Sequence, residues 1–219
     1  KSYLVLASQR TGSTLLCDLL TQTGLAGTPG EHFYHGVNDE IAHKQFPLKD
    51  YPAYIKQVVS DTQTTNGVFG VKLMAGVAGG WAGPMQRLRR LPRYVGMPLA
   101  AVIDEFFPHC CYIYLTRRNK IAQAVSWWKM AQGALGHITD DTQAVETPLA
   151  YNFDAIDHLV NEVMMQEAAH QAFLDELSAV PHTVVHEDFI QNMEGTIQSI
   201  LDFLDLSADC PPLTQKFKR

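Results

Sequence analysis

The stretch YLVLASQRTGSTLLCDLL, residues 3–20, places a short apolar run, a turn of small polar residues and a second apolar run in immediate succession. The first run, residues 3–7, predicts a buried strand, and residues 15–23 predict a helix. A tight turn between a strand and a helix directs backbone N–H groups and the positive end of the helix dipole outward. The order therefore favours an α/β fold in which this turn binds an anion.

The turn departs from the common P-loop pattern G-x-x-x-x-G-K-[ST], because Ala7 stands at the first glycine and Ser13 at the lysine. Gly12 lets the backbone approach an anion closely, and Arg10 can supply the charge of the missing lysine. We therefore predict an anion-binding segment that consists of Arg10, Thr11, Gly12, Ser13 and Thr14. The alternative is an ordinary strand-to-helix turn capped by Thr11 or Ser13.

The rest of the chain alternates between strand-like and helix-like patterns. Further apolar runs predict strands at residues 68–74, 111–116 and 180–185. Helical patterns cover residues 117–132, 152–177 and 188–204. This alternation predicts the α/β class, with a central mostly parallel sheet, helices on both faces and one domain over residues 1–219. Ligands of such sheets lie beyond the carboxyl ends of the strands, which is where the motifs below fall.

Two further segments carry cations to that edge. In TRRNKIAQAVS, Arg118 and Ser126 are eight residues apart and can converge on one anion, since arginine binds phosphate through two donors. The alternative is a solvated basic helix start. Lys72 interrupts the apolar run VFGVKLM near its end. A lysine at such a position is seldom buried without a partner, so it either faces an anion in the cleft or extends to solvent.

Acidic residues suggest a base and a helix cap. Glu31, in the loop GTPGEHFYHG, is a candidate general base for a hydroxyl nucleophile, with His32 and His35 as rival bases. A loop glutamate that is merely solvated is the alternative. Glu187 and Asp188 follow the last predicted strand, and we expect them to cap the helix that begins there.

Composition excludes several classes of protein. The net charge of −6 argues against a nucleic-acid binder with a broad basic surface. No apolar run reaches about 18 residues, so we expect no membrane span. The four cysteines lack zinc-site spacing, and we expect no metal. Free thiols fit a reducing compartment, which predicts a cytoplasmic protein.

Together these motifs resemble the sulfotransferase superfamily, whose sulfuryl donor is 3′-phosphoadenosine 5′-phosphosulfate (PAPS). QRTGST matches its strand–loop–helix, and the pair Arg118 and Ser126 matches its arginine and serine. The late strand that ends in an acidic pair also matches. Within the superfamily the chain is most similar to the bacterial trehalose 2-sulfotransferase type, at residues 3–20, at Gly27 to Phe33, at GVKLM and at QAVSWWKM.

The resemblance implies a P-loop nucleotide-binding fold of the sulfotransferase kind and a role for each candidate. Sulfuryl transfer would run from PAPS to a hydroxyl of a carbohydrate or glycolipid, with trehalose-like sugars among the acceptors. Glu31 would be the base, residues 10–14 would hold the 5′-phosphosulfate, and Lys72 would lie near the transferred group. Arg118 and Ser126 would bind the 3′-phosphate. No metal would be needed.

The resemblance also implies a homodimer, and it makes Lys216, Lys218 and Arg219 candidates to cover the 3′-phosphate. Two other functions remain open. One is a P-loop nucleotide kinase, against which the missing lysine counts. The other is a catalytically inactive nucleotide-binding member of the fold.

Overall fold

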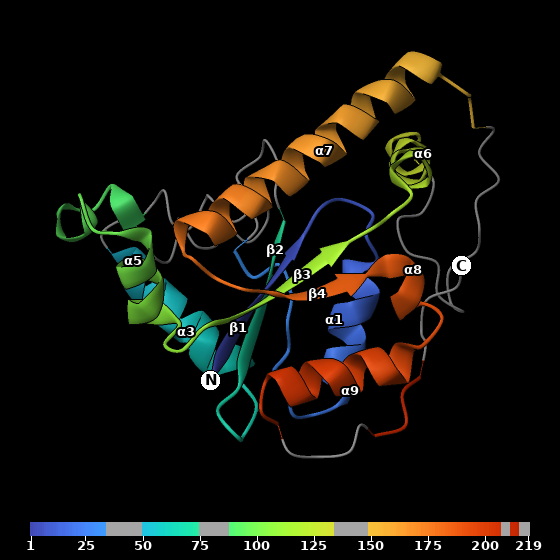
Figure 1. Cartoon of the computed structure of the whole chain (residues 1–219). Coiled ribbons are helices and arrows are strands. Elements are labelled where there is room, and N and C mark those ends of the chain that lie inside the picture. The colour runs from blue at the N-terminus through green and yellow to red at the C-terminus, as the bar shows by residue number, and fades with distance from the viewer. Residues whose placement is uncertain (34–49, 75–87, 134–148, 207–210, 215–219) are drawn as a thin grey trace.

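The computed structural model describes residues 1–33, 50–74, 88–133, 149–206 and 211–214 (Figure 1). At its centre lies a four-stranded sheet in the order β2-β1-β3-β4. The strands are β1 (Ser2–Ala7), β2 (Phe69–Met74), β3 (Cys111–Thr116) and β4 (His182–Val185). Every neighbouring pair is parallel, which confirms the predicted α/β class with a parallel sheet.

The register brings the carboxyl ends of the strands to one edge. Ala7 pairs with Met74 on one side and with Leu115 on the other, and Thr116 pairs with Val185. All six residues of β1 are buried, as expected for a central parallel strand covered on both faces. The segments that follow β1, β3 and β4 are consequently neighbours.

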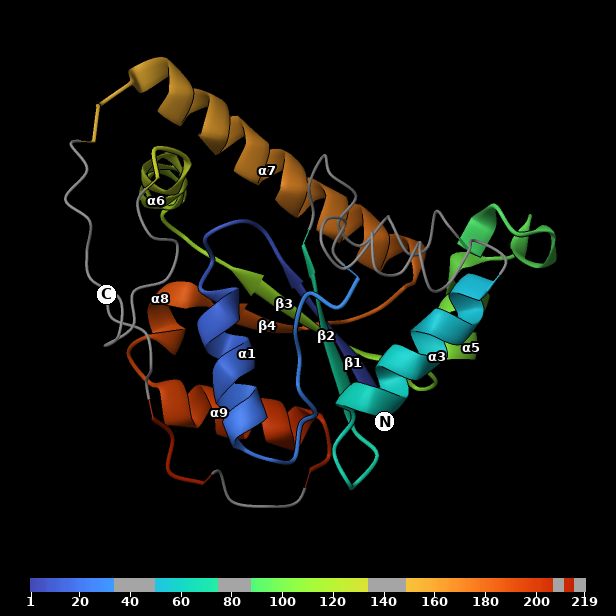
Figure 2. The same cartoon turned by 180° about the vertical axis from the view of Figure 1, so that it is seen from behind.

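Helices cover both faces of the sheet, as predicted (Figures 1 and 2). Alternate residues of β1 face opposite sides. Tyr3 and Val5 join a core with α1 (Ser13–Gln22) and α9 (Met193–Phe203). On the opposite face, Leu4 and Leu6 join a core with three helices, α3 (Tyr51–Thr62), α5 (Leu99–Phe106) and α7 (Phe153–Glu176).

Three further helices of the described residues follow β3, follow β4 or precede α5 in the chain. They are α6 (Lys120–Ala131), α8 (His186–Phe189) and the short 3₁₀ helix η2 (Pro92–Tyr94). The helix α6 packs alongside α7. In the part of the chain that the structure describes, no helix is long and apolar enough to cross a membrane.

One predicted helix, residues 188–204, is two helices in the structure. The helix α8 ends at Phe189, and the side chain of Asn192 accepts a hydrogen bond from the backbone N–H of Gly195, 3.0 Å away. An asparagine cap of this kind begins a new helix, so α9 starts at Met193. An apolar helical pattern does not reveal such an interruption, because the apolar positions continue through it.

Candidate active site

The turn after β1 has the backbone of an anion-binding loop. Arg10 and Gly12 both have positive φ, 63° and 86°. A Cβ on Gly12 would lie 2.7 Å from His186 Nδ1, so both the backbone and its neighbour require glycine there. Gly12 is also the N-cap of α1, and among the described residues no side chain caps that helix. This contradicts the alternative of a turn capped by Thr11 or Ser13, and it leaves the first N–H groups of α1 suited to an anion.

The three hydroxyls of the loop point to different places. Thr11 is fully buried, and its hydroxyl donates to the carbonyl oxygen of Ser8 over 2.9 Å, which stabilises the loop itself. The Ser13 hydroxyl lies 3.9 Å from the sulfur of Met74 at the end of β2. The Thr14 hydroxyl lies 3.3 Å from the Lys72 ammonium. Only Thr14 of these three thus contacts another predicted site residue.

Lys72 joins the loop to the candidate base. Its ammonium lies 2.7 Å from the carboxylate of Glu31, and its side chain is 6% exposed. The backbone N–H of Lys72 donates to the carbonyl oxygen of Gly30 over 2.9 Å, which holds the Glu31 loop against β2. Lys72 therefore does not extend to solvent; its partner is a carboxylate of the same chain. The structure brings Glu31, Lys72 and Thr14 together.

The rival base His32 faces away from this group. Its Nε2 lies 2.9 Å from the carbonyl oxygen of Thr28, and because a carbonyl only accepts, that nitrogen carries the proton. Burial lowers the pKa of His32, with the contact to Thr28 opposing the shift. His35 lies outside the described residues, as do Lys216, Lys218 and Arg219.

The guanidinium groups of Arg10 and Arg117 both form hydrogen bonds at the loop. Nε of Arg10 donates to the hydroxyl of Ser126 over 3.1 Å. Arg117, directly after β3, donates from a terminal nitrogen to the carbonyl oxygen of Arg10 over 3.4 Å. Burial and, secondly, the charge of Arg117 lower the pKa of Arg10. Two positive charges at the loop create a positive potential that favours an anion.

Sequence reasoning missed Arg117. Its signal was its position immediately after an apolar strand, where the side chain meets the carboxyl edge, but the family pattern drew attention to Arg118 instead. Burial lowers the pKa of Arg117, and the carboxylate of Glu187, 3.8 Å from its Nε, opposes the shift.

The predicted pair Arg118 and Ser126 is separate in this structure. Arg118 is exposed and forms an ion pair with Asp188, while the Ser126 hydroxyl accepts from Arg10. No contact between Arg118 and Ser126 is present among the described residues. Their convergence on one phosphate therefore stays a prediction.

The expectation that Glu187 and Asp188 cap their own helix is wrong. The N-cap of α8 is Val185, without a side-chain bond. The Glu187 carboxylate instead accepts from the backbone N–H groups of Arg118 and Asn119, over 3.0 and 3.1 Å. Because β3 and β4 are parallel neighbours, the residues that follow them face each other. Burial raises the pKa of Glu187, but these N–H donors outweigh it and hold the pKa at about 2.

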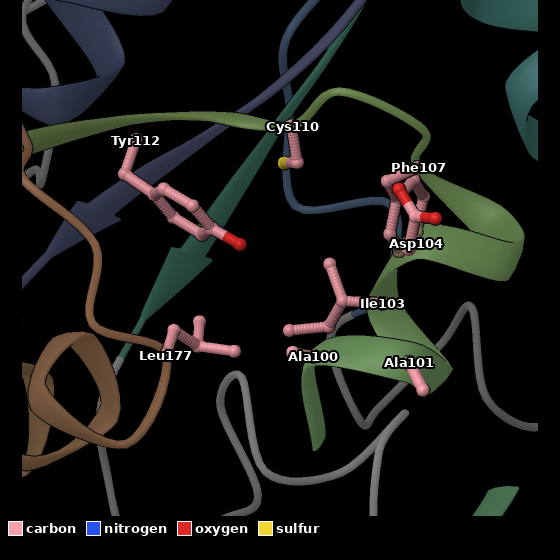
Figure 3. Close-up of a pocket in the computed structure, with 8 residues that line it drawn as sticks. All are labelled: Ala100, Ala101, Ile103, Asp104, Phe107, Cys110, Tyr112 and Leu177. Atoms are coloured by element: carbon pink, nitrogen blue, oxygen red, sulfur yellow. The ribbon is translucent and has the colours of Figure 1, made fainter. Parts of the chain in front are cut away.

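A pocket of about 410 Å³ lies elsewhere (Figure 3). Its lining includes Cys110 and Tyr112 at the amino end of β3, and Leu177 at the end of α7, together with Ala100, Ala101, Ile103, Asp104 and Phe107. Since the strands are parallel, this is the edge opposite the turn that follows β1. Burial raises the pKa of the Cys110 thiol, which disfavours the thiolate. The pocket plays no part in the candidate site.

Among the described residues, no group of three or more histidine, cysteine, aspartate or glutamate side chains is placed to hold a metal ion.

Comparisons with known proteins agree on one family. The profile of the Stf0 sulphotransferase family matches residues 2–217. A trehalose 2-sulfotransferase of Mycobacterium tuberculosis (strain ATCC 35801 / TMC 107 / Erdman) is 31% identical, over 92% of this chain and 83% of the relative. One from Mycolicibacterium smegmatis is 28% identical, over 93% of this chain and 84% of the relative.

A solved structure is also similar. The sulfotransferase from Alicyclobacillus acidocaldarius superposes with a TM-score of 0.56 over 96% of this chain and 83% of that one. At 13% identity this is a likeness of fold.

Proposed function

The chain belongs to the Stf0 sulphotransferase family, and from this premise we propose that it transfers a sulfuryl group from PAPS to a hydroxyl of a carbohydrate or glycolipid. The relatives named trehalose 2-sulfotransferase make trehalose or a trehalose-like sugar the first acceptor to test. The observation that carries the proposal is the contact of one ammonium, that of Lys72, with both the loop and the candidate base.

The loop fits a 5′-phosphosulfate. Its support is the uncapped start of α1, the glycine at position 12 and the two neighbouring guanidinium groups. Arg10 supplies charge, while Thr11 and Ser13 contribute backbone N–H groups because their hydroxyls are turned inward. Bound there, PAPS supplies the sulfuryl group, whose sulfur bonds to the acceptor oxygen as its bond to the 5′-phosphate oxygen breaks.

Glu31 takes the proton of the acceptor hydroxyl. A general base must lie within reach of that hydroxyl, and Glu31 is 37% exposed, so solvent and an acceptor can reach it. Neutralisation of Glu31 leaves the Lys72 ammonium without its anionic partner. The charge of Lys72 then favours the oxygen atoms of the transferred group, which is the electrostatic role expected of a cation at such a centre.

We assign the binding of the 3′-phosphate to Arg118 and Ser126. In the structure each of them already has a partner from the chain itself, Asp188 and Arg10 respectively. We therefore propose that these contacts exchange when the nucleotide binds, because the pair of Arg118 with Asp188 is exposed and screened by solvent, while a phosphate can accept from two donors of the guanidinium.

The test is transfer itself. Purified protein is incubated with radiolabelled PAPS and a panel of sugars that includes trehalose, and sulfated products are identified by mass spectrometry. Labelled sugar is expected. Nucleotide binding without labelled sugar across the whole panel would identify an inactive nucleotide-binding member instead.

A further inference from the structure

The backbone of Gln9, at the start of the predicted anion-binding loop, is held on both sides of its Cα by two glutamine side chains from different helices. Oε1 of Gln166, on α7, accepts from the backbone N–H of Gln9 over 3.1 Å. Nε2 of Gln123, on α6, donates to the carbonyl oxygen of Gln9 over 2.6 Å and to the Ser8 hydroxyl over 3.0 Å. We call Gln123 and Gln166 the glutamine clamp.

Both side chains of the glutamine clamp are buried, and their hydrogen bonds fix which amide atom of each faces Gln9. Gln123 is 0% exposed and Gln166 is 5% exposed. Since an N–H group only donates and a carbonyl only accepts, Gln166 must present its oxygen and Gln123 its nitrogen to Gln9. A buried hydrogen bond that loses one partner leaves the other unsatisfied, so each glutamine contributes more than an exposed one would.

The clamp also connects the two expected phosphate positions. Gln123 and Ser126 are three residues apart on α6 and therefore share a face of that helix. The residue after Gln9 is Arg10, whose side chain contacts Ser126 and whose positive φ is unfavourable for a non-glycine residue. Thus α6 contacts the loop backbone at one position and carries the candidate 3′-phosphate ligand one turn further on.

We propose that Gln123 and Gln166 are positioning residues that hold the loop at a set distance from Ser126, so that the 5′-phosphate site of the donor is preformed. This inference rests on the proposed function. It assigns no contact between either glutamine and the donor: they act through the backbone of the loop. Loss of the clamp should therefore weaken binding of the 5′-phosphate and leave the 3′-phosphate largely unaffected.

The experiment replaces each glutamine by methionine, which keeps the length of the side chain and removes the amide. Dissociation constants are measured for adenosine 3′,5′-bisphosphate, adenosine 5′-monophosphate and adenosine 3′-monophosphate. Gln166→Met should weaken both 5′-phosphorylated nucleotides by about tenfold. Binding of the 3′-monophosphate should stay within about twofold. Gln123→Met should change the three dissociation constants in the same way.

The double variant and a matched control sharpen the test. Both glutamines hold the backbone of one residue, Gln9, so Gln123→Met with Gln166→Met should lose less affinity than the product of the single losses. Gln171→Met makes the same substitution at an exposed position of α7 and should bind all three nucleotides like the wild type. If Gln166→Met does not fold, Gln166→Asn, which shortens the side chain beyond reach of Gln9, takes its place.

Each contrary outcome has its own meaning. A wild-type protein that binds no 5′-phosphorylated nucleotide overturns the proposed function and the clamp together. A wild type that binds them, with clamp variants that bind equally well or that lose all three nucleotides equally, overturns the clamp alone.

Discussion

The ammonium of Lys72, on β2, and the carboxylate of Glu31, in the segment between α1 and α3, lie 2.7 Å apart. At the level of single residues, this contact places the carboxylate of Glu31, the candidate base, next to the loop. The exposed fraction of the Lys72 side chain is 6%, so its charge is directed to the carboxylate and to Thr14 rather than to water. Sequence reasoning found both residues but could not pair them.

Replacement of Glu31 tests the base. Glu31→Gln removes the proton acceptor while it keeps an oxygen that can accept from Lys72. Turnover should fall by about 100-fold or more, since general bases typically contribute 10²–10⁴-fold. The affinity for adenosine 3′,5′-bisphosphate should change little. Transfer assays and calorimetry measure the two quantities.

Glu194→Gln, the same change at an exposed position of α9, is the control and should retain full turnover. An active Glu31→Gln enzyme would remove Glu31 as the base.

Replacement of Gly12 tests whether the loop requires a glycine at this position. Gly12→Ala forces an L side chain into a positive φ and places its Cβ against His186, so the folded protein should lose roughly 1–3 kcal/mol. Gly24→Ala is the control, because Gly24 also has a positive φ, of 66°, but a Cβ there would meet nothing within 4 Å. Urea unfolding of the two variants separates steric contact from strain. Equal losses would show that His186 is not the constraint.

At the scale of elements, Glu187 attaches α8 to the start of α6. Its pKa is lowered, from 4.5 to about 2, so the ionised carboxylate is favoured in the folded state. A lowered folded pKa contributes stability that is present above the unfolded pKa and is lost as the pH falls through the folded one. Glu187→Gln should therefore destabilise the protein by roughly 1–2 kcal/mol at neutral pH. The difference from the wild type should shrink between about pH 5 and pH 2.

Asp188→Asn is the matched control on the same helix. Its pair with Arg118 is exposed on both sides, 59% and 58%, and solvent screens such pairs, so Asp188→Asn should change the stability little at any pH. Urea unfolding at a series of pH values measures both variants. A Glu187→Gln difference that does not depend on pH would contradict the role of the ionised carboxylate.

For the whole molecule, nucleotide binding should raise the unfolding temperature selectively. At a ligand concentration of about 100 Kd, binding stabilises the folded state by about 2.7 kcal/mol. For a chain of this size that corresponds to a shift of roughly 5–10 °C. Adenosine 3′,5′-bisphosphate should produce this shift, and ATP with Mg²⁺ a smaller one at the same concentration. The reverse order in differential scanning fluorimetry would favour the nucleotide kinase.

The positions of elements along the chain followed from local patterns. Strands β1, β2 and β3 lie where continuous apolar runs predicted them, and β1 and β2 are buried along their whole length. The break between α8 and α9 was missed because it depends on one cap, that of Asn192. A cap leaves the apolar period unchanged, so periodicity does not detect it.

The α/β class, the turn at the end of β1 and the residue types at the carboxyl edge could all be predicted from the amino-acid sequence. They follow from apolar patterning and turn chemistry, which depend on residues close in the chain. The partners of the side chains were known only from the folded structure: Lys72 with Glu31, Glu187 with the start of α6, and the clamp on Gln9. The physical reason is the strand order β2-β1-β3-β4, which makes neighbours of segments distant in sequence. A charged or amide side chain pairs with the polar groups that this strand order places within hydrogen-bond distance.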